Sequence, residues 1–191
     1  MMGNRNKHKR QAKEETYIRV FRESTKWSPY LDGSTILRWR KSMDHTAEIG
    51  HLSVLEWLHA NRADGCSPLG MEHAAGSGHL HVVEWLHANR AEGSTLWGPV
   101  DLAAQNGHLH VLEWLRANRT EGCTTEAMDL AAKNGQLCAV EWLHGNRNEG
   151  CTTEAIDLAA TNGHLSVVEW LHANRTEGCT TGAMNGAARN G

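Results

Sequence analysis

The sequence predicts an all-α fold, an α-solenoid of stacked helix-turn-helix repeats. A phrase of the type GHLxVLEWLxANR recurs along the chain, and its opening glycines are 28 or 29 residues apart; they are Gly50, Gly78, Gly107, Gly135, Gly163 and Gly191. Tryptophans keep the same interval, at Trp57, Trp85, Trp114, Trp142 and Trp170. Such a period is typical of repeat proteins, in which each unit buries its apolar faces against its neighbours.

Each unit begins with a short predicted helix, as in residues 124–135, TTEAMDLAAKNG. Thr124 is the expected N-cap, because its hydroxyl can accept a backbone N–H that the first turn leaves unpaired. At 100° per residue, one side of the helix carries Ala127, Met128, Leu130, Ala131 and Ala132, and the other carries Glu126, Asp129 and Lys133. Gly135 ends the helix in a left-handed turn.

The second predicted helix of the unit runs from about His108 to Asn118. Its apolar residues are Leu109, Val111, Leu112, Trp114 and Leu115, and its remaining stripe is His110, Glu113 and Arg116. The apolar arc covers more than half of the circumference, which favours a helix packed between neighbours. The letters RTEG then turn the chain into the next unit.

The segments AMDLAAKNGQLCAVEWL and AIDLAATNGHLSVVEWL resemble the ankyrin repeat motif T-P-L-H-x-A-A-x-x-G-H-L-x-V-V-x-x-L-L. The resemblance covers residues 40–191 and implies helix pairs with a concave partner-binding groove. Two departures accompany it. The family's TPLH becomes EAMD at residues 126–129, although Pro99 keeps the family's proline. The unit is also about five residues shorter than the usual 33, so we expect an array without the long β-hairpin finger.

Three segments are expected along the chain. Residues 1–13 form a basic, disordered tail, residues 14–39 form an N-terminal cap of unknown fold, and residues 40–191 form five helix pairs and a terminal helix. In the terminal helix, Gly186 replaces the leucine of other copies, which costs about 1 kcal/mol in a helix interior. The basic N-terminus leads into no apolar segment, so we expect a cytoplasmic protein, with the nucleus as second choice.

Charge divides the chain and limits its partners. Residues 1–49 hold 11 Lys and Arg against 6 Asp and Glu, a net charge of +5, whereas residues 50–191 hold 8 against 16, a net of −8. An acidic array repels phosphate backbones, so it is a poor nucleic-acid binder. Nucleic-acid contact through the basic N-terminal segment stays open as an alternative. The longest apolar runs are too short to span a membrane.

Repetition argues against catalysis and against a metal site. A catalytic centre needs unlike residues that converge once, whereas the candidate groups recur in register. One histidine column comprises His59, His87, His144 and His172, with Arg116 in the middle copy; the other comprises His51, His79, His108 and His164. Neighbouring units lie about 8–10 Å apart, too far for shared zinc ligands. We therefore expect structural histidines, no metal, no cofactor and no enzymatic activity. The cysteine column of Cys66, Cys123, Cys151 and Cys179 is expected to stay as free thiols.

Variation between copies points to a binding face. Second helices barely change, whereas first helices differ most at two outward positions that flank an acidic column of Asp44, Glu72, Asp101, Asp129 and Asp157. In the ankyrin family this face lines the concave groove. The acids have two interpretations, either loop hydrogen bonding as for the family's histidine or partner contact. The varied positions have two as well, either binding specificity or neutral drift on a solvated surface.

We expect a monomeric protein–protein interaction module, an adaptor or scaffold, whose partner has a basic or mixed surface. A purely structural spacer is the alternative. Trp97 stands outside the tryptophan register in a 29-residue unit, and tryptophan is enriched at binding hot spots; with Leu69 and Leu96 it is expected to form an apolar anchor. The candidate contact residues are Leu69, Glu72, Leu96, Trp97, Asp101, Gln105, Glu126, Asp129, Lys133, Glu154, Asp157 and Thr161.

Overall fold

The computed structural model describes residues 43–61, 67–89, 98–120 and 122–190. Within these ranges every regular element is a helix. Residues 43–48 are helical, and the elements that follow are α3 (Leu52–Asn61), α4 (Leu69–Gly76), α5 (Leu80–Asn89), α6 (Pro99–Gln105), α7 (Leu109–Asn118), α8 (Thr125–Lys133), α9 (Leu137–Asn146), α10 (Glu154–Thr161), α11 (Leu165–Asn174) and α12 (Thr181–Asn190). The expected segments 1–13 and 14–39 lie outside the described residues.

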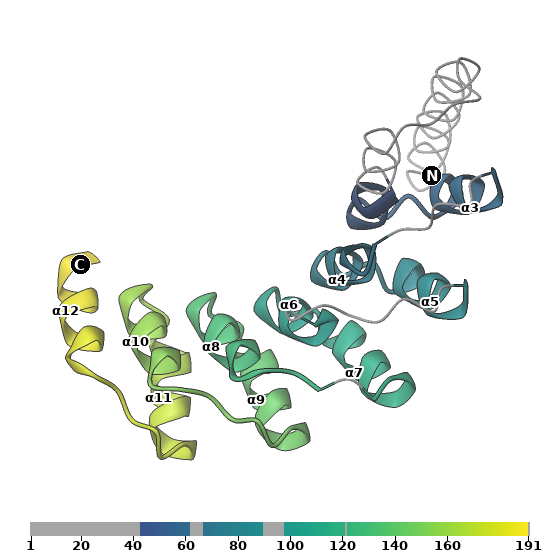
Figure 1. Ribbon diagram of the computed structural model, residues 1–191. Helices are drawn as coiled ribbons and strands as arrows, with labels where there is room; N and C mark the ends of the chain where they lie inside the picture. Colours follow the sequence, from purple (N-terminus) through teal and green to yellow (C-terminus); the bar gives the residue numbers. More distant parts are fainter. Residues whose placement is uncertain (1–42, 62–66, 90–97, 121, 191) are drawn as a thin grey trace, which may run out of the picture.

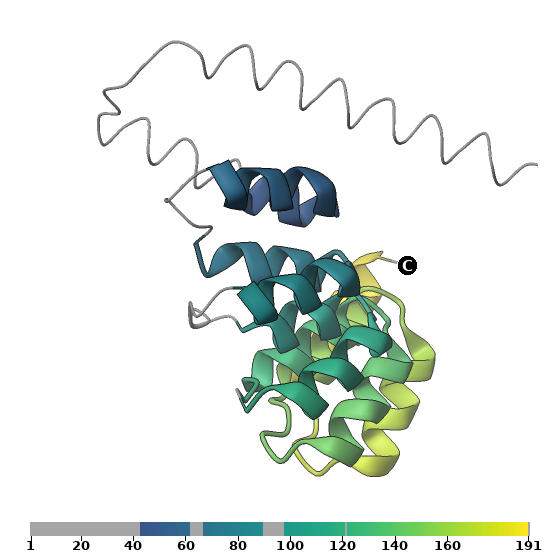
Figure 2. The same ribbon diagram turned by 90° about the vertical axis from the view of Figure 1, so that its right-hand side faces the viewer.

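The helices form two layers that curve together (Figure 1). The first helices of the repeats, α4, α6, α8, α10 and α12, pack side by side along the inner side of the curve. The second helices α5, α7, α9 and α11 lie on the outer side, each against its own first helix. Figure 2 shows the same stack from the side, with the repeats in sequence order. The predicted all-α solenoid is confirmed.

Glycine ends each first helix where the sequence predicts it. Gly135 has φ of 71°, a left-handed conformation that costs glycine little. Its N–H donates to the carbonyl of Ala132 at 3.1 Å, and the N–H of Gln136 donates to that of Ala131 at 2.9 Å. Both bonds satisfy carbonyls that the helix end leaves unpaired. The turn thereby sets the angle at which the second helix folds back.

The core runs continuously through the array. First helices supply alanine and one larger residue, such as Met128, and second helices supply buried residues such as Val111, Leu112 and Leu115. The repeated tryptophans pack against this core but remain partly exposed. His110, Glu113 and Arg116 form the exposed stripe predicted for the second helix.

The helical wheel is wrong for two residues of α8. Asp129, expected on the outward side, is only 4% exposed, and Leu130, expected in the core, is partly exposed and outside the core cluster. Both errors have one cause. Each internal first helix packs against first helices on both sides as well as against its own second helix, so its buried arc is rotated from the purely apolar one.

Asparagine side chains connect successive first helices. The amide of Asn134 donates to the carbonyl of Gln105 at 2.9 Å, one repeat earlier. Equivalent bonds join Asn106 to Gly76, Asn162 to Lys133 and Asn190 to Thr161, at 2.7, 3.0 and 2.8 Å. This ladder adds a directional register to the apolar packing between repeats.

Both histidine columns contact the neighbouring repeat. The rings of His79, His108 and His164 lie over the turn glycines of the preceding repeat, so close that a Cβ there would approach to 2.7 Å. The rings of His59, His87 and His144 meet the tryptophan of the next repeat edge to face, with centroids 5.2 to 5.3 Å apart. These contacts give both columns a packing role.

Candidate functional site

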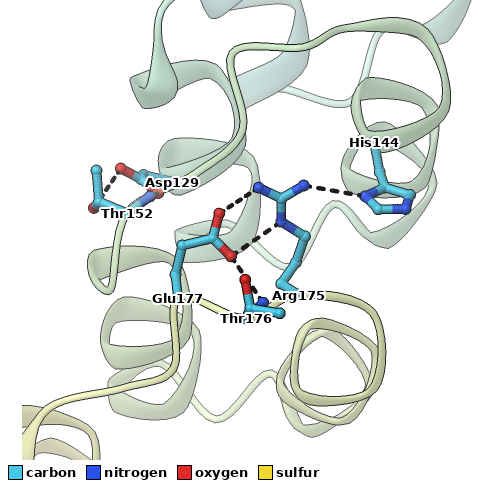
Figure 3. Close-up of polar contacts among 6 residues, drawn as sticks. All are labelled: Asp129, His144, Thr152, Arg175, Thr176 and Glu177. Atoms are coloured by element: carbon cyan, nitrogen blue, oxygen red, sulfur yellow. Dashed lines mark hydrogen bonds and ion pairs between the residues drawn. The ribbon is translucent and has the colours of Figure 1, made fainter.

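The acidic column of the first helices connects neighbouring repeats. The carboxylate of Asp129 accepts the backbone N–H of Thr152 at 2.9 Å and its hydroxyl at 2.8 Å. The same hydroxyl accepts the N–H of Glu154 at 3.1 Å and so caps α10. Figure 3 shows the pair of Asp129 and Thr152. One carboxylate thereby holds both the loop and the helix start of the next repeat.

The same arrangement recurs at a separation of 23 residues. Asp44 accepts from Ser67, and Asp101 accepts from Thr124, through the backbone N–H at 2.9 and 3.0 Å and through the hydroxyl at 2.7 Å in both cases. Asp157 accepts from the N–H of Thr180 at 2.9 Å and from its hydroxyl. Thr124 is the N-cap of α8, as predicted. For these aspartates the structure favours the loop-bonding interpretation.

Burial changes the acid–base behaviour of two of these carboxyls. Desolvation raises the pKa of Asp101 from 3.8 to about 6, although hydrogen bonds from Thr124 oppose the shift. Burial likewise raises the pKa of Asp129, against the hydrogen bonds from Thr152. The acids therefore lie in an environment that favours neutral side chains, as is expected of structural groups inside the fold.

The remaining candidate contact residues divide by exposure. Leu69, Lys133 and Glu154 are exposed, with Leu69 at 42%, and Gln105, Glu126, Asp157 and Thr161 are partly exposed. Glu72 and Asp101, at 1% each, lie inside the fold with Asp129. All of these residues belong to α4, α6, α8 and α10, so the structure brings them onto one layer. Leu96 and Trp97 lie outside the described residues.

Three leucines of the same layer were missed as contact candidates. Leu102, Leu130 and Leu158 are partly exposed and belong neither to the core cluster nor to the side chains packed against it. Leu130 lies four residues after Glu126 and three before Lys133, so it shares their helix face. The leucines recur at intervals of 28 residues. A helical wheel assigns them to the core because it counts only their apolar character.

A second polar cluster fixes the loop between α11 and α12 (Figure 3). The guanidinium of Arg175 donates to both carboxylate oxygens of Glu177 and contacts Nδ1 of His144 at 3.4 Å. Glu177 also accepts the N–H of Thr176 at 3.0 Å. The hydrogen bond from Arg175 lowers the pKa of Glu177. Because these groups satisfy one another inside a short turn, the cluster is structural.

The other chemically reactive groups are kept apart. Among the described residues, no group of three or more His, Cys, Asp or Glu side chains could hold a metal ion. Cys123, Cys138, Cys151 and Cys179 are free thiols. Burial raises the pKa of Cys123 to about 12 and also raises that of Cys151. Both buried thiols are therefore weak nucleophiles near neutral pH.

These features define a helical repeat protein whose conserved-looking parts hold repeats together and whose variable parts lie on the inner layer. The family model for ankyrin repeats in many copies matches residues 71–116 and 128–172. The chain belongs to the ankyrin repeat family. Ankyrin repeats are generally protein–protein interaction modules. No curated protein matches the chain.

The repeats of this chain lack the family's β-hairpin finger wherever the connection is fully described. The α9–α10 and α11–α12 connections, residues 147–153 and 175–180, contain no strand. In the part of the chain that the structure describes, no helix has the length and apolar character needed to cross a bilayer.

Proposed function

We propose that the chain is an adaptor or scaffold that binds a protein partner on its inner face. We define the inner face as Leu69, Leu102, Gln105, Glu126, Leu130, Lys133, Glu154, Leu158 and Thr161. The row of partly exposed leucines on α6, α8 and α10 carries the proposal, because these side chains add little to the core and lie beside polar residues. Protein interfaces have this anatomy of an apolar centre and a polar rim.

The charges of the inner face favour a partner with a basic or mixed surface. Glu154 is exposed and Glu126 partly exposed, with Lys133 as the nearest described cation on the same helices. The net charge of −8 over residues 50–191 adds a long-range attraction for cationic partners. The buried acids Glu72, Asp101 and Asp129 support the fold beneath this surface and are not among the proposed contacts.

Leucine identity also differs along the inner face, which supports selectivity for one partner. The register of Leu102, Leu130 and Leu158 carries His73 in the earlier repeat and Gly186 in the last one. The apolar row therefore covers only three consecutive repeats. A partner segment that follows it would contact α6, α8 and α10, with α4 at the margin through Leu69. Leu96 and Trp97 stay in the proposal as sequence candidates for the same edge.

Peptides selected from a random display library on the intact chain supply a defined probe for this proposal. Each selected peptide is titrated against Glu126→Lys/Glu154→Lys and against the matched outer-layer variant Glu113→Lys/Glu141→Lys, whose glutamates are exposed on α7 and α9. We expect basic peptides that lose at least ten-fold in affinity with the inner variant only. A rim charge acts mainly through electrostatic complementarity, so the loss should shrink at high salt.

Three outcomes would contradict the proposal. The selection could yield no binder, as expected of a spacer. It could yield binders that both charge variants weaken equally, which would indicate attraction to net charge alone. It could also yield binders that only the outer variant weakens, which would place the interaction on α7 and α9. Circular dichroism of both variants checks that the helices are intact.

A further inference from the structure

The face that α11 and α12 present at the C-terminal end of the described array is apolar and uncovered. Met184 of α12 is 78% exposed and Leu165 of α11 is 66% exposed. Ala187 and Ala188 of α12 are exposed as well. Most large apolar side chains of the described array are buried or packed against the core. This end face is therefore the main apolar surface outside the inner face.

Register comparison shows that these positions are buried in the internal repeats. The counterparts of Met184 are Met43, Met71, Val100, Met128 and Ile156, all between 2% and 8% exposed. The counterparts of Leu165 are Leu52, Leu80, Leu109 and Leu137, which pack against the core. The same side chains in the same helical register thus become exposed where no further repeat lies beside them.

A depression marks the place of the missing contact. It has a volume of about 430 Å³ and is lined by Ala160, Thr161, Asn162, Gly163, Ala187 and Asn190. Gly163 has φ of 76°, like the other turn glycines, but a Cβ there would meet nothing within 4 Å. At Gly50, Gly78 and Gly135 the same space holds a histidine ring, and at Gly107 it holds the side chain of Gln136.

The internal interfaces therefore show what chemistry fits this surface. Each second helix starts with a histidine or glutamine over the preceding glycine and then packs on its own first helix and on the preceding second helix. At the end face, α12 and α11 supply the corresponding two walls, and the depression beside Gly163 supplies the place for the polar side chain. The surface continues the geometry of an interface that already recurs through the array.

We propose that the end face of α11 and α12 is a docking site for an amphipathic helix of a partner protein, one that opens with histidine or glutamine followed by leucine, as the second helices of this chain do. This is helix-in-groove recognition. The site is separate from the inner face. Arg189 is the only charged residue of α12, so the apolar face of such a helix meets little repulsion.

A peptide with the sequence of residues 163–175, GHLSVVEWLHANR, is the direct probe. Labelled with a fluorophore and blocked at both ends, it is titrated against the intact chain by fluorescence anisotropy. Short isolated helices are marginal in water, so we expect saturable but weak binding, with a Kd of roughly 10 μM to 1 mM. The peptide with alanine for histidine, His164→Ala, should bind several-fold more weakly.

Variants of the chain locate the binding. Met184→Glu should weaken the peptide by at least ten-fold, whereas the matched variant Leu69→Glu, which changes an exposed leucine of the inner face, should leave it unchanged. In the unmodified chain, the amide signal of Gly163 should shift on peptide addition, which tests the site without any substitution. Failure of peptide binding here and failure of inner-face binding are separate results, because different variants report on each.

Absence of saturation, or equal affinity for Met184→Glu and the unmodified chain, would overturn the proposal. Sedimentation of the chain alone distinguishes a second copy as the occupant. A dimer that becomes monomeric in Met184→Glu would show that the end face pairs with itself, and the proposed partner helix would then be wrong.

Discussion

The carboxylate of Asp129 holds Thr152 of the next repeat through two hydrogen bonds, from the backbone N–H at 2.9 Å and from the hydroxyl at 2.8 Å. The carboxylate lies inside the fold, at 4% exposure. Equivalent pairs are Asp44 with Ser67, Asp101 with Thr124 and Asp157 with Thr180. This bond pair gives the stacked repeats a fixed angular relationship that apolar packing alone would not specify.

Loss of the Thr152 hydroxyl should destabilise the array. Thr152→Val removes a donor to Asp129 and the cap of Glu154, so we expect a cost of about 1–2 kcal/mol in the free energy of unfolding. In a double-mutant cycle with Asp129→Ala, the coupling energy should be about 1–3 kcal/mol. Urea denaturation measures both. Thr153→Val is the control, because the Thr153 side chain makes no capping bond, and a coupling near zero would contradict the account.

The stability of the array should depend on the ionisation of Asp101. Its pKa is raised from 3.8 to about 6, so its contribution to stability is fully present below pH about 4 and is lost as the pH rises through 6. The difference corresponds to about 3 kcal/mol. Asp101→Asn cannot ionise, so the unfolding free energy of the wild type minus that of Asp101→Asn should fall between pH 4 and pH 7. A rise over this range would show that hydrogen bonds from Thr124 outweigh burial.

Two turn glycines separate backbone strain from contact with the next repeat. Gly135 and Gly163 have φ of 71° and 76°, but a Cβ would meet the ring of His164 only at Gly135. Gly163→Ala should cost about 1–2 kcal/mol through the left-handed backbone alone. Gly135→Ala should cost a further ~1–3 kcal/mol because the histidine must move. Thermal denaturation compares the two, and equal costs would mean that the ring adds no constraint.

One histidine missing from its column offers a stabilising substitution. His59, His87 and His144 each meet a tryptophan of the next repeat edge to face, whereas Arg116 holds the register before Trp142. Arg116→His should restore the contact and raise the free energy of unfolding by about 0.5–1 kcal/mol. Arg116→Ala controls for loss of the arginine. If both variants unfold alike, the ring contact contributes nothing to stability.

The repeat pattern predicted most of the fold because the local signals agree with one another. Thr124 caps its helix, Gly135 ends it, and the apolar arc of the second helix is buried, all as the sequence indicates. Each of these features depends on residues within one unit. A period of 28 or 29 residues then requires neighbouring units to pack alike.

The candidate site was predictable only in part. Variation between copies identified the layer of first helices, but it could not separate Asp129, which bonds to the next repeat, from Glu126, which lies at the surface. That distinction depends on a partner 23 residues away. Leu130 was misplaced for a related reason, since its exposure follows from how three neighbouring helices surround α8. The uncovered state of Met184 likewise needs the neighbours to be seen in space.

Methyl NMR of the leucines tests the central claim most directly. The intact chain, with labelled leucine methyl groups, is titrated with a peptide selected on it. We predict shifts at Leu102, Leu130 and Leu158, and unchanged signals for the buried leucines Leu86, Leu115 and Leu143. If instead the inner-face leucines keep their positions while signals of the outer layer move, the inner face is not the binding surface of this protein.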